Sequence, residues 1–206
     1  MGKPSKRRAQ KAAARRKAKR KAARPNLPQM RLPSLPSDAP IHECLIPRTL
    51  FELGIGNVLI ARELPDGQIA MATFLLDVFC LGVKDVAFGV FGVSEYRERT
   101  RFTADDSFEA ASPATAQALV EGAVGYAQRF GLSPHHDYHV ACRIFAGVDP
   151  GLAHRAFSYG KDGKPFYVSG PRDTPAKSKL VLAALESVCG PGGFDFMVVA
   201  AAGVGK

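Results

Sequence analysis

The sequence predicts an α+β (mixed α/β) domain, in which helices pack on a single mixed sheet, preceded by a disordered basic tail. Three observations predict this architecture. Strand-like segments fill the first half of the domain, and apolar residues recur at helical spacing through most of the second half. Positively charged residues are concentrated at the N-terminus. A length of 206 residues suits one domain with an appendage. We assign residues 1–40 to the tail and a Pro-rich linker, and residues 41–206 to one globular domain.

Strand-like segments follow one another in the first half of the domain. Residues 57–64 and 68–80 flank Pro65-Asp66-Gly67, a combination that favours a tight turn. The second of these segments does not alternate cleanly between apolar and polar residues, so we expect a central strand that is buried on both faces. A third strand is predicted around residues 85–93.

Three helices are predicted from pairs of an N-cap residue and a proline. Ser112-Pro113, Ser133-Pro134 and Thr174-Pro175 each match the first turn of a helix. Apolar residues at helical spacing follow each pair, extending to about residue 130, to residue 145 and to residue 188. Short strands are predicted at residues 165–169 and 194–201.

Positive charge is distributed very unevenly along the chain. The net charge is +9, but residues 1–24 hold twelve of the 28 Lys and Arg residues and no acidic residue. Residues 25–206 therefore hold 16 bases against 19 acids, a net charge of −3. The basic character of the protein belongs to the tail, and the domain has no overall attraction to polyanions.

The tail predicts a polyanionic partner, which we take to be nucleic acid or the ribosome. A dense run of Lys and Arg releases counterions from phosphates and binds without reading bases. Like charges and few apolar residues predict disorder, and five prolines in residues 25–40 predict an extended linker. The alternative is a solubilising extension with no dedicated partner. The residues predicted to bind are Lys6, Arg7, Arg8, Lys11, Arg15, Arg16, Lys17, Lys19, Arg20, Lys21 and Arg24.

Cysteine usage and hydropathy predict a soluble cytoplasmic protein with no membrane partner. The four cysteines are far apart and form no CxxC pair, which favours reduced, mostly buried thiols. The charged N-terminus is not followed by the apolar stretch of a signal peptide. The longest apolar run, residues 69–83, is interrupted by Thr73 and Asp77 and is too short to span a bilayer.

Asp77 is the first candidate catalytic residue, because it interrupts an apolar strand. A buried carboxylate needs a partner or a function. Together with Asp85 it could hold Mg²⁺ in a nuclease-like site, since hard cations prefer oxygen ligands. The alternatives are a salt bridge from Asp77 to Lys84 or Arg62, or an Asp that faces solvent.

Histidines are concentrated in the predicted second helix. His135, His139 and Cys142 would share one side of this helix and could bind a divalent metal as cofactor. His42 and Cys44 could supply a further pair of ligands. The alternative is that the histidines are exposed polar residues and that Cys142 is a buried core thiol.

The segment 169–175 joins a predicted strand to a predicted helix. Free backbone N–H groups, the helix dipole and Arg172 could hold a phosphate there. The simpler alternative is a tight turn followed by an ordinary Thr174 cap.

Three segments, 74–85 (FLLDVFCLGVKD), 118–137 (ALVEGAVGYAQRFGLSPHHD) and 166–175 (FYVSGPRDTP), resemble parts of an uncharacterised bacterial protein family. The resemblance covers most of the domain and none of the tail. It implies a bacterial, cytoplasmic setting and no particular activity.

Three classes of function follow from these features. The first is non-enzymatic, non-specific association with nucleic acid or the ribosome through the tail. The second is a metal-dependent, nuclease-like hydrolase with its site at Asp77 and Asp85 or at His135, His139 and Cys142. The third is a protein-interaction module tethered by its tail.

Overall fold

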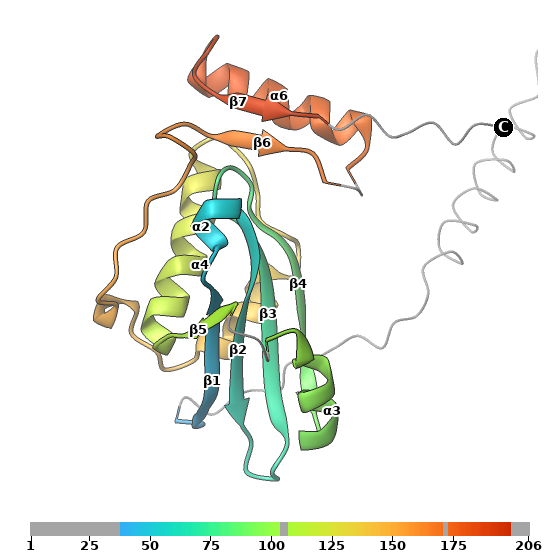
Figure 1. Ribbon diagram of the computed structural model, residues 1–206, viewed down its shortest axis with the longest axis vertical. Coiled ribbons are helices and arrows are strands. Elements are labelled where there is room, and N and C mark those ends of the chain that lie inside the picture. The colour runs from blue at the N-terminus through green and yellow to red at the C-terminus, as the bar shows by residue number, and fades with distance from the viewer. Residues whose placement is uncertain (1–37, 104–106, 171–172, 199–206) are drawn as a thin grey trace, which may run out of the picture. The chain divides into compact units, whose positions relative to one another are not determined.

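Figure 1 shows a computed structural model that describes residues 38–103, 107–170 and 173–198. The predicted disordered tail and all of its candidate binding residues lie outside the described residues, and so does most of the predicted linker. Apart from residues 38–40, which end the linker, the described residues all belong to the predicted domain.

A five-stranded antiparallel sheet forms the centre of the domain (Figure 1). Its strands are β1 (Ile41–Pro47), β2 (Ile55–Glu63), β3 (Ile69–Asp77), β4 (Gly82–Phe91) and β5 (Phe108–Ala110). Their order is β4-β3-β2-β1-β5, and every neighbouring pair is antiparallel. Strands β2, β3 and β4 confirm the three strands predicted in this half, whereas β1 and β5 were not predicted.

Strands β2 and β3 are buried on both faces of the sheet. Even-numbered residues such as Ile60 and Phe74 belong to the main core, and odd-numbered residues such as Leu59 and Met71 belong to a second core on the opposite face. This division follows from the two-residue period of a strand. It confirms the prediction that residues 68–80 contain a central strand without clean alternation.

The helices are α2 (Leu50–Leu53), α3 (Val93–Arg99), α4 (Pro113–Gln128), α5 (Tyr138–Ala141) and α6 (Pro175–Cys189). Helix α4 contacts β1, β2, β3 and β4, so it crosses the face of the sheet that carries the main core. Gly82 (φ 66°) permits a close approach here, because a Cβ on it would lie 2.8 Å from the carbonyl oxygen of Ala123. Tyr96 of α3 covers one end of the opposite face.

The predicted N-caps of two helices are confirmed. The Ser112 side chain accepts a hydrogen bond from the backbone N–H of Thr115, and the Thr174 side chain accepts one from Lys177. Each bond satisfies a donor that the first turn of a helix leaves without an intrahelical partner. Local sequence therefore determines where α4 and α6 begin.

A small second sheet pairs β6 (Phe166–Val168) with β7 (Asp195–Met197) in parallel, and α6 connects the two strands. A separate core that includes Tyr167, Val181 and Leu185 joins this unit to the β3–β4 turn and to α4. The predicted α+β class, with helices packed on a sheet, is confirmed. The antiparallel and parallel pairings are separated into two sheets, where the sequence suggested one mixed sheet.

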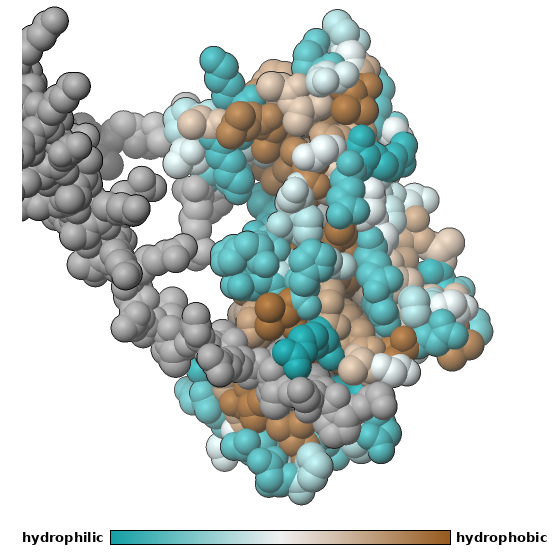
Figure 2. Space-filling view, turned by 180° about the vertical axis from the view of Figure 1, so that it is seen from behind, coloured by the Kyte–Doolittle hydropathy of each residue, from teal (hydrophilic) through white to brown (hydrophobic). Residues whose placement is uncertain are grey.

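Two helical predictions need correction. The second helix was expected to begin near residue 134, but α5 begins at Tyr138 and continues as a 3₁₀ helix, Cys142–Phe145. The predicted apolar side of the last helix is only partly buried, since Leu180 is 72% exposed and Val188 is 55% exposed. Figure 2 shows apolar surface at the end of the domain formed by β6, β7 and α6.

Arg62 is the main buried cation of the described domain. It is 2% exposed, and its guanidinium donates to the carbonyl oxygens of Ile144 (2.7 Å), Ala39 (2.9 Å) and Ala146 (2.7 Å). Burial lowers the pKa of Arg62. The side chain ties β2 both to the residues that precede β1 and to the segment that follows α5.

Among the described residues, no helix is both long enough and apolar enough to cross a membrane.

Candidate functional site

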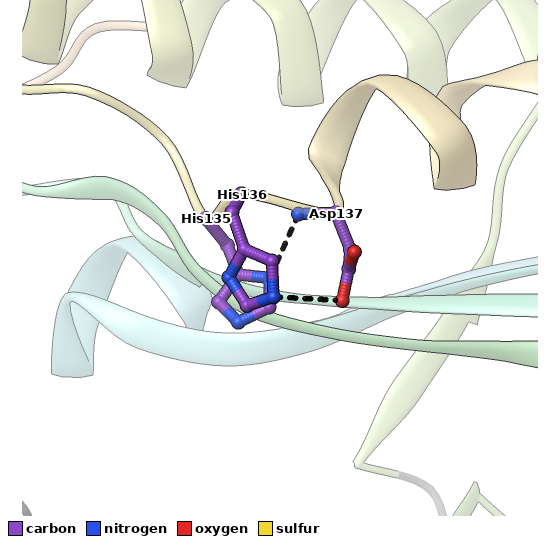
Figure 3. Close-up of side chains that lie close together, drawn as sticks. All are labelled: His135, His136 and Asp137. Carbon is purple, nitrogen blue, oxygen red and sulfur yellow. Dashed lines mark hydrogen bonds and ion pairs between the residues drawn. The ribbon is translucent and has the colours of Figure 1, made fainter. Parts of the chain in front are cut away.

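The candidate site is a cluster of four side chains, Asp85 on β4 and His135, His136 and Asp137 in the loop that precedes α5. Figure 3 shows the three side chains of the loop. We call these four residues the His-Asp cluster. Two of its members, Asp85 and His135, were predicted from the sequence as parts of two separate sites. The structure brings these two together and adds His136 and Asp137, which were not predicted.

The loop is held against the sheet by its backbone. Strand β4 is an edge strand of the sheet. The N–H of His135 donates to the carbonyl oxygen of Val83 on this strand at 2.9 Å. The N–H of Tyr138 then bonds the carbonyl oxygen of His135, which turns the chain into α5. These contacts fix His135 beside Asp85.

The polar atoms of the cluster lie within a few ångströms of one another. His135 Nε2 lies 3.6 Å from Asp85 Oδ1, and His136 Nε2 lies 3.2 Å from Asp137 Oδ2. The backbone N–H of Asp137 donates to His135 Nδ1 at 3.3 Å. The two imidazole rings are 4.1 Å apart, centroid to centroid. Figure 3 shows both rings beside the Asp137 carboxylate. One ligand atom from each of His135, His136 and Asp137 fits within a span of 4.8 Å.

Asp85 also lines a shallow hollow of about 260 Å³ on the sheet. Asn57, Thr73 and Leu75 line the same hollow, and Asn57 and Thr73 supply polar groups. The odd-numbered positions on β2 and β3 face away from α4, so the hollow lies on the opposite side of the sheet from the main core. The His-Asp cluster therefore borders an open space that a small ligand could enter.

Asp77 lies at the end of β3 and stabilises the turn into β4. Its Oδ1 accepts hydrogen bonds from the backbone N–H groups of Phe79 (3.2 Å) and Cys80 (2.9 Å), and its Oδ2 lies 4.0 Å from Lys84 Nζ. Burial raises the pKa of Asp77 to about 6, against the opposing effects of Lys84 and of the N–H groups. Among the alternatives predicted for Asp77, the salt bridge to Lys84 agrees with these contacts.

The suggested pairing of Asp77 with Asp85 around Mg²⁺ stays a prediction, and the contacts of the two residues favour the alternative of an ion pair with Lys84. Asp77 is engaged by the turn and by Lys84, whereas Asp85 accepts from the N–H of Val86 at 2.9 Å and contacts His135. These contacts of the two carboxylates differ, and only Asp85 belongs to the His-Asp cluster. The other suggested partner of Asp77, Arg62, is bound to carbonyl oxygens instead.

No protein-family model, curated protein or solved structure matches this chain. The resemblance to a bacterial family stays a prediction from the sequence, and function has to be argued from the residues themselves.

The predicted ligand set of His135, His139 and Cys142 does not come together. It required one continuous helix, but His135 precedes α5, and the close group of potential ligands in the described part of the chain is His135, His136 and Asp137. Burial also raises the pKa of the Cys142 thiol to about 11, which disfavours the thiolate that metals bind. In the suggested second pair, burial raises the pKa of Cys44 to about 12, which also disfavours its thiolate.

In the segment that follows β6, the carboxylate of Asp173 lies at the suggested phosphate site. Asp173 Oδ2 accepts from the backbone N–H of Gly170 at 2.8 Å, and Asp173 Oδ1 lies 2.7 Å from Lys177 Nζ. A negative charge thus stands where the suggested phosphate would bind, which supports the alternative of a capped turn. Arg172 lies outside the described residues.

The buried Asp77 predicts a pH dependence of stability. Because its pKa is raised from 3.8 to about 6, the folded state binds a proton more tightly than the unfolded state, and this contribution to stability is lost as pH rises through about 6. Asp77→Asn removes the titration. We expect the unfolding free energy of the variant, relative to that of the wild type, to increase by up to about 3 kcal/mol as the pH rises from about 4 to above 6.

Chemical denaturation at a series of pH values measures this difference, in which the other carboxylates cancel. A difference that stays constant would show that Lys84 and the N–H groups balance the effect of burial. A difference that turns in favour of the wild type as pH rises would show that they outweigh it.

Proposed function

We propose that this protein associates with nucleic acid, free or within the ribosome, through residues 1–24 and without sequence preference. The observation that carries the proposal is the charge distribution: twelve cations and no acid in 24 residues. Such a segment gains free energy from the release of counterions from phosphates, whatever the bases. Single nucleotides offer too few phosphates to engage many of these cations, so long polyanions are the favoured partners.

The charges of the domain support the proposal that the tail, and not the domain, supplies the affinity for nucleic acid. Residues 25–206 carry a net charge of −3, and several surface arginines are paired with acids. Arg99 contacts Glu95 at 2.8 Å, and both Arg48 and Arg155 contact Glu109. Paired cations are less able to neutralise phosphates, so the domain adds little to the affinity.

We place the protein in the cytoplasm. All four cysteines are free thiols, and two of them, Cys44 and Cys80, are buried. Reduced thiols are typical of a reducing compartment. Ribosomes and RNA are found in the same compartment, which agrees with the proposed partner.

Two full-length variants test the proposal. In the first, the twelve Lys and Arg residues of residues 1–24 are replaced by Gln, and in the second the order of these 24 residues is scrambled. We expect the first to lose affinity for RNA and for duplex DNA by about 10³-fold or more at low salt. The scrambled variant keeps every charge and should bind within about threefold of wild type.

Filter binding with labelled RNA and DNA of unrelated sequences gives both affinities. Strong binding by the neutralised variant would contradict the proposal, because the domain would then supply the affinity. A large loss in the scrambled variant would contradict its non-specific character, because order and not charge would then decide binding.

A further inference from the structure

We propose that His135, His136 and Asp137 bind one divalent transition-metal ion, with Asp85 as the residue that orients His135. This inference is independent of the tail, because it concerns the folded domain alone. It differs from the two metal sites that the sequence suggested and shares residues with both.

The spacing of the side chains matches the geometry of a metal centre. In a tetrahedral site with metal–ligand bonds of about 2.0–2.1 Å, neighbouring ligand atoms are about 3.3 Å apart. His136 Nε2 and Asp137 Oδ2 are already 3.2 Å apart, and one ligand atom from each of the three residues fits within a span of 4.8 Å. His136 is 76% exposed, so its ring can rotate to close the remaining distance without disturbing the core.

The contacts of His135 determine which of its nitrogens would bind the metal. Nε2 faces the carboxylate of Asp85, and Nδ1 accepts the long hydrogen bond from the N–H of Asp137. This pattern places the ring proton on Nε2 and the lone pair on Nδ1, so a metal bound at Nδ1 would replace the long contact from the N–H of Asp137. Asp85 would then hold the ring as the carboxylate partner of a metal-bound histidine, an arrangement that fixes the tautomer and makes the ligand more basic.

The ligand set favours a particular class of metal. Two imidazoles and one carboxylate suit Zn²⁺, Ni²⁺, Cu²⁺ or Fe²⁺, whereas Mg²⁺ prefers oxygen ligands and retains most of its water. Three protein ligands leave at least one position for water or for an added ligand, as in catalytic zinc sites. The hollow lined by Asn57 and Thr73 touches the cluster at Asp85, on the Nε2 side of His135. The open position of the metal would instead face solvent beside the exposed His136.

Other histidines of the domain provide matched controls. His139 and His154 are exposed and lie outside the close group of ligands, although His139 is only a few residues from it in sequence. The tail contains no His, Cys or acidic residue that could bind the ion in place of the cluster.

The full-length wild type is compared with His136→Ala, Asp85→Asn, His139→Ala and His154→Ala in a zinc titration against a chromophoric chelator. We expect one Zn²⁺ per wild-type chain, an affinity about 100-fold lower or worse in His136→Ala, and an affinity about 10–100-fold lower in Asp85→Asn. The two control variants should bind as wild type does. Binding should weaken as pH falls, because protons compete with the metal.

Thermal unfolding provides the second readout. Zn²⁺ should raise the Tm of the wild type and of both controls but not that of His136→Ala, while all Tm values agree without metal. The proposal is overturned if the wild type binds no stoichiometric Zn²⁺, or if His139→Ala weakens binding as much as His136→Ala does. Preferential binding of Mg²⁺ would overturn the assignment of the metal class.

Discussion

Replacing Arg62 with alanine is expected to lower the free energy of unfolding by about 3–5 kcal/mol. Arg62 is 2% exposed, and its guanidinium donates to three backbone carbonyls from two segments that are far apart in the sequence. The substitution leaves these acceptors without their donor and opens a cavity beside β2. Urea denaturation followed by circular dichroism measures the loss.

Arg97→Ala is the matched control, because this arginine is exposed on α3 and should tolerate truncation within about 0.5 kcal/mol. Arg62→Lys should be intermediate, since an ammonium group can reach fewer of the carbonyl oxygens than the planar guanidinium. A loss below about 1 kcal/mol in Arg62→Ala would mean that water replaces the guanidinium at little cost.

Raising the salt concentration is expected to weaken nucleic-acid binding more than any single substitution. If about six to ten of the twelve cations contact phosphates, the logarithm of the association constant should fall against log salt with a slope of about −5 to −9. Affinity should then drop about 10³- to 10⁵-fold between about 50 and 200 mM salt. Fluorescence anisotropy with a labelled duplex gives the slope.

The slope also reports the number of cations that contact phosphate. Variants with half of the twelve cations replaced should show about half the slope, whichever half is chosen, because the contacts are equivalent. A slope near zero would contradict an electrostatic mode of binding. A slope that depends strongly on which half is replaced would point to a localised site.

Local patterns predict the fold well where local contacts decide it. Ser112 and Thr174 start their helices because each side chain caps a free N–H, and the Pro65-Asp66-Gly67 turn lies between two strands that pair along their whole length. Strand β1 was missed because it follows a Pro-rich segment and is held by pairing with β2 and β5, which no local pattern reveals.

The second helix shows how tertiary contacts override a local signal. Ser133-Pro134 has the residues of a helix start, yet the backbone of His135 is used to bond the outer strand β4. The chain can therefore turn into a helix only at Tyr138. The loss of the expected helix is what allows His135 and His136 to lie together.

Individual residues of the candidate site could be recognised from the sequence, but their grouping could not. Asp85 and His135 are 50 positions apart in the numbering, and they meet because α4 returns the chain to the edge of β4. The signal that could have found His136 and Asp137 is the tripeptide His135-His136-Asp137 itself, three potential ligands in a row. No sequence pattern indicated that Arg62 is buried, because a charged residue near the end of a strand is usually exposed.

The separation of charge between tail and domain is the central claim, and RNA binding by the isolated domain tests it most directly. The full chain and residues 38–206 are compared in filter binding at about 50 and 200 mM salt, after thermal unfolding has shown that the domain is folded. We expect the full chain to bind RNA at the lower salt and to release most of it at the higher, and the domain to bind at neither. RNA binding by the domain within about tenfold of the full chain would contradict the claim.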